Sequence, residues 1–192
     1  MADRAEDRRV LRTQRLLREA LVSLVLEKGY EAVTVQQIVA RADVGRSTFY
    51  AHYLGKEQLL LSGFDVLEAQ LAPATRAAAE RKAALPLAFT RGLFQHVHEH
   101  RSLYRVIVGR RSGMMVQHRM RVLVQKLLRA DLAAASLPVP PEAAVHFLAG
   151  AFLAHVAWWL DHQARLTPAE AEKTFRRLAL RGLALPNVDR RP

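Results

Sequence analysis

The stretch TVQQIVARADVGRSTFYAHYLGKEQLL, residues 34–60, contains two short helical patterns on either side of a turn. Thr34 and Gln37 have the spacing of a capping box, in which a hydroxyl and an amide each satisfy a free backbone N–H at a helix start. Asp43 follows the first pattern, and aspartate tolerates the left-handed backbone of a sharp turn better than most residues. The stretch therefore predicts two short helices joined by a tight turn.

The second of these helices is predicted from near Gly45 to about Tyr53, and its residues divide between two faces. Phe49 and Tyr53 are four residues apart and share one face, which is typical of a side that packs on the preceding helices. If Phe49 anchors that side, the polar residues must point away from the core. The outward face then consists of Arg46, Ser47, Thr48, Tyr50 and His52.

This outward face has the chemistry of a recognition helix in a helix-turn-helix, whose first turns meet base edges in the major groove. Arg46 matches guanine through two parallel hydrogen bonds, and hydroxyl and imidazole groups can donate to phosphates. Lys56 lies at the start of the next helix, where an ammonium and free N–H groups both favour an anion. Thr34 has the equivalent place on the preceding helix, so both are predicted phosphate contacts.

The segment EKGYEAVTVQQIVARADVGRSTFYAHYLGKEQLL resembles the DNA-binding domain of the TetR family of bacterial transcriptional regulators. The resemblance covers roughly residues 11–60. Three positions depart from the family pattern, which usually has Ala where Val39 stands and Gly where Asp43 stands. The family also favours Ser, Asn or Asp where Gly55 caps the fourth helix, so a side-chain cap is lost there.

The resemblance implies a homodimer that binds a palindromic operator and is released by a small-molecule effector, more commonly as a repressor than as an activator. It implies a DNA-binding domain at residues 1–55, a connecting helix at 56–72, and an effector-binding and dimerisation domain at 73–192. Residues 141–166 and 167–185 correspond to the helices that form a four-helix dimer interface in this family. The former segment is apolar on more than one face, which fits packing on a partner, although a buried central helix in a monomer remains an alternative.

The rest of the chain is also predicted to be helical, so the fold class is all-α. Leu17 to Gly29 carries an apolar stripe at helical spacing, with Gly29 as a left-handed cap. The fourth helix is expected to run toward Pro73, and Pro86 is expected in the first turn of another helix. Thr167, followed by a proline and a glutamate, predicts the start of the last helix.

Composition limits the class of protein. The 192 residues include 51% hydrophobic residues and no Cys, which excludes disulfides, thiolate metal sites and Cys nucleophiles. The charged N-terminus is unlike a signal peptide, and no run of about 18 uncharged apolar residues occurs, so the expectation is a cytoplasmic protein without a membrane span. The net charge of +11 favours polyanionic partners such as nucleic acid.

The positive charge is not concentrated in the predicted DNA-binding segment. Residues 1–57 hold ten Lys and Arg against eight Asp and Glu, whereas eight basic residues and no acidic ones lie between Glu99 and Asp131. The second stretch fits either an anionic effector or simply the basic outer faces of two helices, the more common arrangement. The candidate effector-pocket residues, which fit an ordinary helical core equally well, are Tyr104, Met114, Met115, His118, Trp158 and Trp159.

The sequence also bears on a metal site and on an enzyme. In QHVHEH, only His96 and His100 share a helical face, and a zinc site needs three or four ligands, so no metal and no cofactor are predicted. Phosphate-binding loops, zinc-protease motifs and nucleophile elbows are absent from the sequence, so an enzyme is not expected. The alternatives are a small helical hydrolase, using Ser136 with Asp161 and His162, and a basic DNA-binding protein that is indifferent to sequence.

Overall fold

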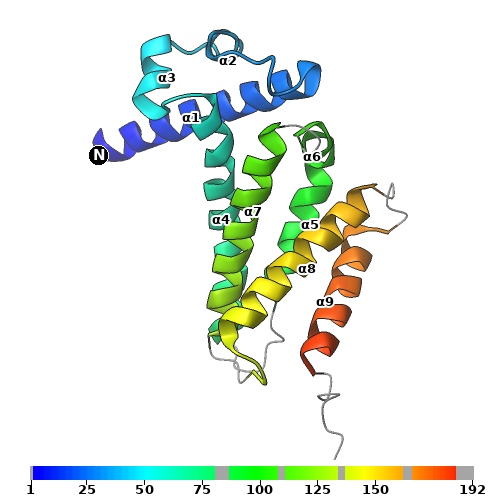
Figure 1. Cartoon of the computed structure of the whole chain (residues 1–192). Coiled ribbons are helices and arrows are strands. Elements are labelled where there is room, and N and C mark those ends of the chain that lie inside the picture. Colours follow the sequence, from blue (N-terminus) through cyan, green and yellow to red (C-terminus); the bar gives the residue numbers. More distant parts are fainter. Residues whose placement is uncertain (1, 81–86, 108–110, 134–136, 162–165, 185–192) are drawn as a thin grey trace, which may run out of the picture. The chain divides into compact units, whose positions relative to one another are not determined.

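The protein is described here by a computed structural model. It covers residues 2–80, 87–107, 111–133, 137–161 and 166–184, without the side chains of residues 2–6, 74, 76–80, 111, 112 and 182–184. The described part is helical throughout and contains no strand, which confirms the predicted all-α class (Figure 1). The helices are α1 Ala2–Lys28, α2 Val35–Ala42, α3 Arg46–His52, α4 Lys56–Glu80, α5 Thr90–Glu99, α6 Arg101–Ile107, α7 Arg111–Leu132, α8 Pro141–Asp161 and α9 Pro168–Ala184.

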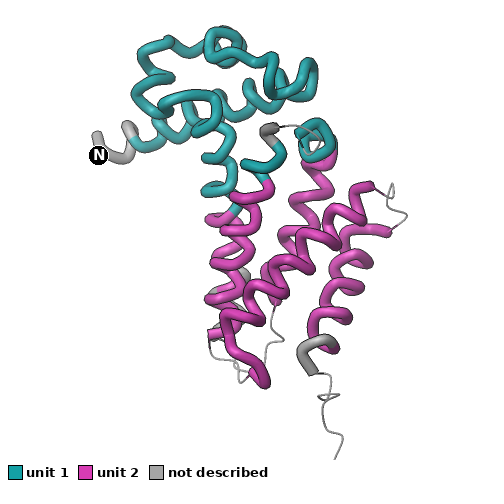
Figure 2. Tube along the Cα trace, viewed as in Figure 1, with its two compact units in different colours: residues 1–67, 102–116 teal, residues 68–101, 117–192 magenta. Residues whose placement is uncertain are grey.

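The chain forms two compact units (Figure 2). The first comprises residues 1–67 with 102–116, and the second comprises residues 68–101 with 117–192. These limits differ from the predicted division at residues 55 and 72: α4 begins directly after residue 55 and continues without a break past residue 72. The predicted domain limits therefore remain a prediction about independently folding parts.

The core of the first unit is built on the apolar stripe of α1. Leu17, Leu21 and Val25 are fully or almost fully buried, as their helical spacing predicts. Gly29 follows the last helical residue with a φ of 81°, which is the left-handed cap expected there. The helix extends further toward the N-terminus than the stripe alone indicates, because it begins at Ala2.

The core of the second unit contains an aromatic cluster contributed by α5, α8 and α9. The centre of the Phe94 ring lies 5.3 Å from the ring centre of Phe152, 5.6 Å from that of Trp159 and 6.1 Å from that of Phe175. All four residues are almost completely buried. Edge-to-face aromatic contacts of this kind contribute beyond the apolar area that they bury.

Two helix limits differ from the expectation based on proline. The fourth helix continues through Pro73 to Glu80, because Pro73 lies on the exposed side while Leu71 and Thr75 are buried. The fifth helix begins at Thr90 rather than near Pro86, which lies outside the described residues. Leu87 has a φ of 75°, so the chain cannot be helical there.

Helix α8 is apolar on more than one face. Val145, Leu148 and Phe152 are buried, whereas Phe147 is 60% exposed and Trp158 is 43% exposed. By length and composition α8 is the one helix of the described ranges that could cross a membrane, and only 33% of its apolar window is buried. The two apolar faces confirm the pattern predicted from the sequence.

Candidate nucleic-acid interface

Helix α2 begins and ends as its sequence predicts. The backbone N–H of Thr34 donates to Gln37 Oε1 at 3.0 Å, and that of Gln37 donates to Thr34 Oγ1 at 3.3 Å, which completes the capping box. Asp43 ends the helix with φ 52° and ψ 48°, in the left-handed region. The backbone N–H of Val44 then donates to Val39 O at 3.0 Å, so the turn into α3 is tight.

The buried side of α3 is anchored by Phe49, which has no exposed surface. The centre of the Phe49 ring lies 5.9 Å from the centre of the Tyr53 ring, and Tyr53 is 5% exposed. The Tyr53 hydroxyl oxygen accepts a hydrogen bond from Arg18 Nη1 at 3.4 Å. The residue that caps the end of α3 is therefore linked to α1 by a side-chain hydrogen bond.

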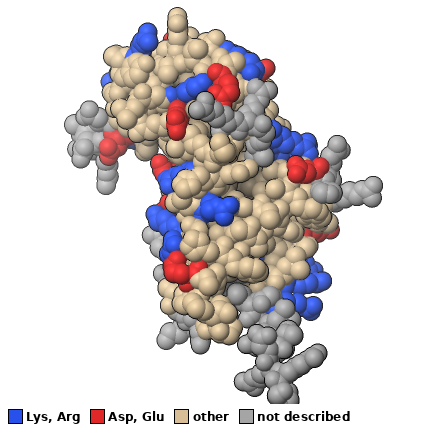
Figure 3. All heavy atoms as spheres, in the orientation of Figure 1, with Lys and Arg blue, Asp and Glu red and all other residues tan. Residues whose placement is uncertain are grey.

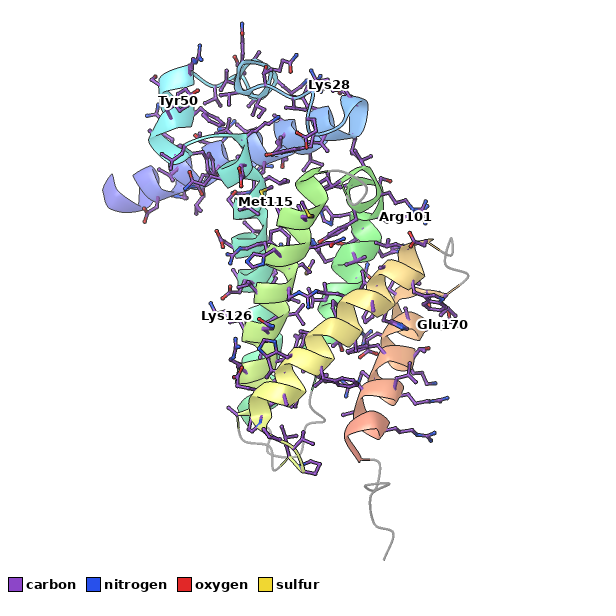
Figure 4. The ribbon with its side chains drawn as sticks, in the orientation of Figure 1. Lys28, Tyr50, Arg101, Met115, Lys126 and Glu170 are labelled. Atoms are coloured by element: carbon purple, nitrogen blue, oxygen red, sulfur yellow. The ribbon has the colours of Figure 1, made fainter. Side chains whose placement is uncertain are left out.

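The opposite side of α3 is the predicted polar face. Arg46 and Ser47 are exposed, Thr48 and His52 are partly exposed, and Tyr50 is 48% exposed. Figure 4 labels Tyr50 on α3. The guanidinium carbon of Arg46 lies 5.9 Å from the centre of the Tyr50 ring, one turn away, a distance at which a cation is attracted to the ring face. This contact places the cation and the phenol on the same exposed face.

Thr34 keeps a donor for a ligand although it caps α2. Its side-chain oxygen accepts from Gln37, and the hydroxyl hydrogen is not needed for that bond. Thr34 is exposed, so this hydrogen is accessible to solvent. The geometry is compatible with the predicted phosphate contact.

Lys56 is arranged differently from the prediction. Its Nζ donates to three backbone carbonyls, Tyr30 O at 3.0 Å, Glu31 O at 3.2 Å and Val33 O at 2.8 Å. A lysine ammonium has three N–H donors, so all of them have protein acceptors. The prediction that this side chain is available to a phosphate is not supported by this geometry.

Helices α1 and α2 are joined by an ion pair and a hydrogen bond that the sequence did not predict. Arg41 donates through two nitrogens to the two carboxylate oxygens of Glu27, at 2.6 and 3.0 Å, and to Ser23 Oγ at 2.7 Å. Hydrogen bonding to Arg41 lowers the pKa of the Glu27 carboxyl below its ordinary value. The partners are 14 and 18 residues apart, so no helical spacing signals the contact.

The candidate effector residues have different environments. Trp159 is buried in the aromatic cluster, and its indole N–H donates to Leu166 O at 3.0 Å. Trp158 is 43% exposed and Met114 is 72% exposed, and His118 is also exposed, while Met115 is partly exposed. Burial raises the pKa of the Tyr104 phenol well above its ordinary value. Their predicted role in effector binding remains a prediction.

The two histidines that share a helical face, His96 on α5 and His100 at its C-cap, lie side by side. The rings of His96 and His100 stack with centroids 4.3 Å apart, and burial, with a further effect of His100, lowers the pKa of His96 to about 4. His98 instead stacks beside Trp159. In the parts of the chain that the structure describes, His, Asp and Glu nowhere gather into a group of three that could hold a metal ion.

Several basic residues of α7 are neutralised by acids. Arg129 forms a two-point ion pair with Glu142, and Lys126 pairs with Glu68. On the face shown in Figure 3, Lys and Arg are interspersed with Asp, Glu and uncharged residues. Ser136 and His162, two members of the alternative hydrolase set, lie outside the described residues.

Comparison with known proteins gives two family matches. Residues 17–62 match the model described as bacterial regulatory proteins of the tetR family, and residues 86–181 match a transcriptional regulator C-terminal region. The first match includes α2, the turn and α3, together with the start of α4.

Individual relatives agree with these matches. The HTH-type transcriptional regulator YxbF of Bacillus subtilis is 42% identical over 55 residues, which cover 28% of this chain and 14% of that protein. The HTH-type transcriptional regulator TcmR of Streptomyces glaucescens is 39% identical over 62 residues, or 32% of this chain and 27% of TcmR. The matched segments thus span well under half of either relative.

The fold is also similar to that of solved structures. A TetR-family transcriptional regulator from Syntrophomonas wolfei superposes with a TM-score of 0.70 over 92% of this chain and 97% of its own, at 15% identity. At that identity the likeness concerns the fold alone.

Proposed function

This chain is a helix-turn-helix transcriptional regulator that belongs to the TetR family, and we propose that it binds a palindromic operator as a homodimer. The observation that carries the proposal is the orientation of α3, with Phe49 buried and Arg46 and Tyr50 exposed. A short helix held in this way presents a cation and several donors to the major groove. We further propose that a small effector binds within residues 73–192 and releases the DNA, so that the protein acts in the cytoplasm as a repressor.

The proposed DNA contacts divide into two kinds. Arg46 reads a guanine, because a guanidinium donates two parallel hydrogen bonds to O6 and N7. Polar neighbours set the register on the phosphates without reading sequence. These phosphate contacts are Thr34, Ser47, Thr48, Tyr50 and His52.

The proposed dimer uses the exposed sides of α8 and α9. Phe147 on α8 and Leu178 on α9 are large apolar side chains that are 60% and 64% exposed in the single chain. Covering them with a second copy removes apolar surface from water, which is the main favourable term in association. A twofold dimer would present two copies of α3 to half-sites about 34 Å apart.

The proposed effector response requires only modest coupling between effector and operator. An effector that favours a dimer with the wrong spacing needs a coupling free energy of about 1–3 kcal/mol to change operator affinity about 5- to 150-fold. The proposed lining residues are Tyr104, Met114, Met115, His118, Trp158 and Trp159. Trp159 would line the site through its ring, since its N–H is bonded to Leu166.

Enrichment of genomic DNA tests the proposal directly. Fragments of the source genome are incubated with purified protein at fixed salt and with excess random competitor, and the bound fragments are sequenced. A reader of sequence should enrich a small set that shares an inverted repeat. Uniform recovery of all fragments would instead indicate a sequence-indifferent basic DNA-binding protein, which the net charge of +11 would explain. Failure to retain any DNA would refute both.

A further inference from the structure

Three backbone carbonyls converge in the loop between α1 and α2. Residues 30–33 lie outside both helices, so most of their carbonyl oxygens have no helical partner. Tyr30 O accepts from the backbone N–H of Val33 at 3.2 Å, and it also accepts from Lys56. Glu31 O and Val33 O complete the set around the Lys56 ammonium. The loop thus forms a small cation-accepting cradle, which is filled by the first residue of α4.

The ring of Tyr30 closes one side of this cradle. The ammonium nitrogen of Lys56 lies 4.5 Å from the centre of the ring, a distance typical of a cation–π contact. Burial, with smaller effects of Glu57 and Glu31, raises the pKa of the Tyr30 phenol to about 12. Lys56 itself is only partly exposed. A phosphate that took this ammonium would remove a donor from all three carbonyls, and only Tyr30 O would keep its bond from the backbone N–H of Val33.

The cradle is placed between two helix starts. Val33 directly precedes Thr34, the N-cap of α2, and Lys56 is the first residue of α4. We propose that Lys56 is a positioning residue that fixes the start of α2 relative to the start of α4, and that its side chain does not contact DNA. The inference rests on the proposed function, because the spacing of these two helix starts matters only if both face the operator.

The ammonium itself provides a test that does not depend on DNA. A lysine NH₃⁺ with three protein acceptors exchanges slowly with water, whereas a solvated one exchanges fast. Side-chain ¹H–¹⁵N spectra of the free full-length protein should therefore show a protected ammonium signal that is missing in Lys56→Met. Adding the enriched operator should leave the signal in place. Its absence from the free protein, or its appearance only with DNA, would overturn the proposal.

Three variants separate positioning from phosphate contact. Lys56→Met removes the charge and keeps most of the apolar stem, and Lys56→Arg keeps the charge in a planar group that cannot point at three carbonyls together. Lys28→Met is the matched control, because Lys28 is an exposed lysine at the end of α1 (Figure 4). Each is measured for Tm and for operator affinity over a range of salt concentrations.

If Lys56 is a positioning residue, Lys56→Met and Lys56→Arg should have the same effects. Both variants should lose at least about 4 °C in Tm and about tenfold in operator affinity, while the slope of log affinity against log salt stays at the wild-type value. The Lys28 control should keep its Tm.

A phosphate contact predicts the reverse pattern. Lys56→Met would then reduce the slope by about 0.9 with little change in Tm, and Lys56→Arg would bind as the wild type does. Either result overturns the proposal. If a variant does not fold, the ammonium spectrum of the wild-type protein decides. If the wild-type protein binds no operator, the proposed function fails, and the spectrum still reports whether the cradle exists.

Discussion

Phe49 has no exposed surface, although Tyr50 beside it is 48% exposed. This contrast within a seven-residue helix decides which groups can reach another molecule. The aromatic anchor is fully buried, and the cation of Arg46 and the phenol of Tyr50 remain exposed. A short helix has little stability of its own, so its orientation depends on such an anchor.

Truncation of the anchor should be costly. We expect Phe49→Ala to destabilise the protein by about 3–5 kcal/mol, because a fully buried ring is removed and a cavity remains. Tyr50→Ala is the control on the neighbouring residue and should cost well under half as much, since half of that side chain is exposed. Thermal unfolding of both variants measures the difference. Equal losses would mean that the two faces of α3 are assigned incorrectly.

Removal of the Arg46 guanidinium should affect specificity. We expect Arg46→Ala to weaken binding to the enriched operator by about 1–3 kcal/mol and to weaken binding to random duplex much less. Competition binding at fixed salt measures both affinities. Arg121→Ala, which removes an exposed arginine from α7, is the charge-matched control. An equal loss on both duplexes would make Arg46 a phosphate contact instead of a base reader.

At the scale of elements, the turn between α2 and α3 contains a non-glycine residue in the left-handed region. Such a conformation is strained for a residue with a side chain, and less so for aspartate than for most. We expect Asp43→Gly to stabilise the protein by about 0.5–1 kcal/mol and Asp43→Ala to destabilise it. The order of the three melting temperatures, Gly above Asp above Ala, tests the assignment. Indistinguishable values would show that the turn relaxes without strain.

Because of His96 on α5, the stability of the protein is expected to depend on pH. The pKa of His96 is lowered to about 4 in the folded protein, from an ordinary value of 6.5, chiefly by burial. Between these values the unfolded chain binds more protons than the folded one, so stability falls as the pH is lowered from about 6.5 to about 4. His96→Gln should therefore lose less Tm between pH 7 and pH 5 than the wild type.

The exposed His118 provides the control for that measurement. His118→Gln keeps the imidazole of His96, so this variant should retain the acid sensitivity of the wild-type protein. If both variants follow the wild-type curve, another group accounts for the acid response.

Local signals in the sequence predicted the elements around the site, and long-range contacts limited the prediction. The capping box at Thr34 and the left-handed Asp43 involve residues at most four apart, so the sequence pattern contains all the information needed. The partners of Lys56 lie 23 to 26 residues before it, and Glu27 lies 14 before Arg41. A helical period contains no information about such pairs, so the sequence alone predicts a phosphate contact for Lys56 and does not reveal its three carbonyl partners.

The same limit applies to the second unit. Leu87 lies in a left-handed conformation with its N–H bonded to the Asp131 carboxylate, 44 residues away, and its carbonyl accepts from Arg176 at 2.9 Å. These contacts determine where α5 begins, and no local pattern in the sequence predicts them. The two apolar faces of α8, in contrast, are visible in the sequence because they repeat at helical spacing.

At the scale of the whole molecule, the proposed activity depends on two copies of α3 held at a fixed separation. A single α3 offers few base contacts, and two half-sites read together approximately add their free energies of binding. Phe147, exposed on the outer side of α8, is a suitable position at which to separate the copies. A charge placed there would have to be buried without a partner if the dimer formed.

We expect Phe147→Glu to yield a folded monomer that loses nearly all operator affinity while it retains weak binding to random duplex. Sedimentation velocity measures the association state, and thermal unfolding shows whether the chain still folds. Val122→Glu is the control, because it adds the same charge at a partly exposed apolar residue of α7. A Phe147→Glu protein that stays dimeric would place the interface elsewhere. A monomer that binds the operator as tightly as the wild type would refute the need for two recognition helices, because the remaining α3 would then supply the whole affinity.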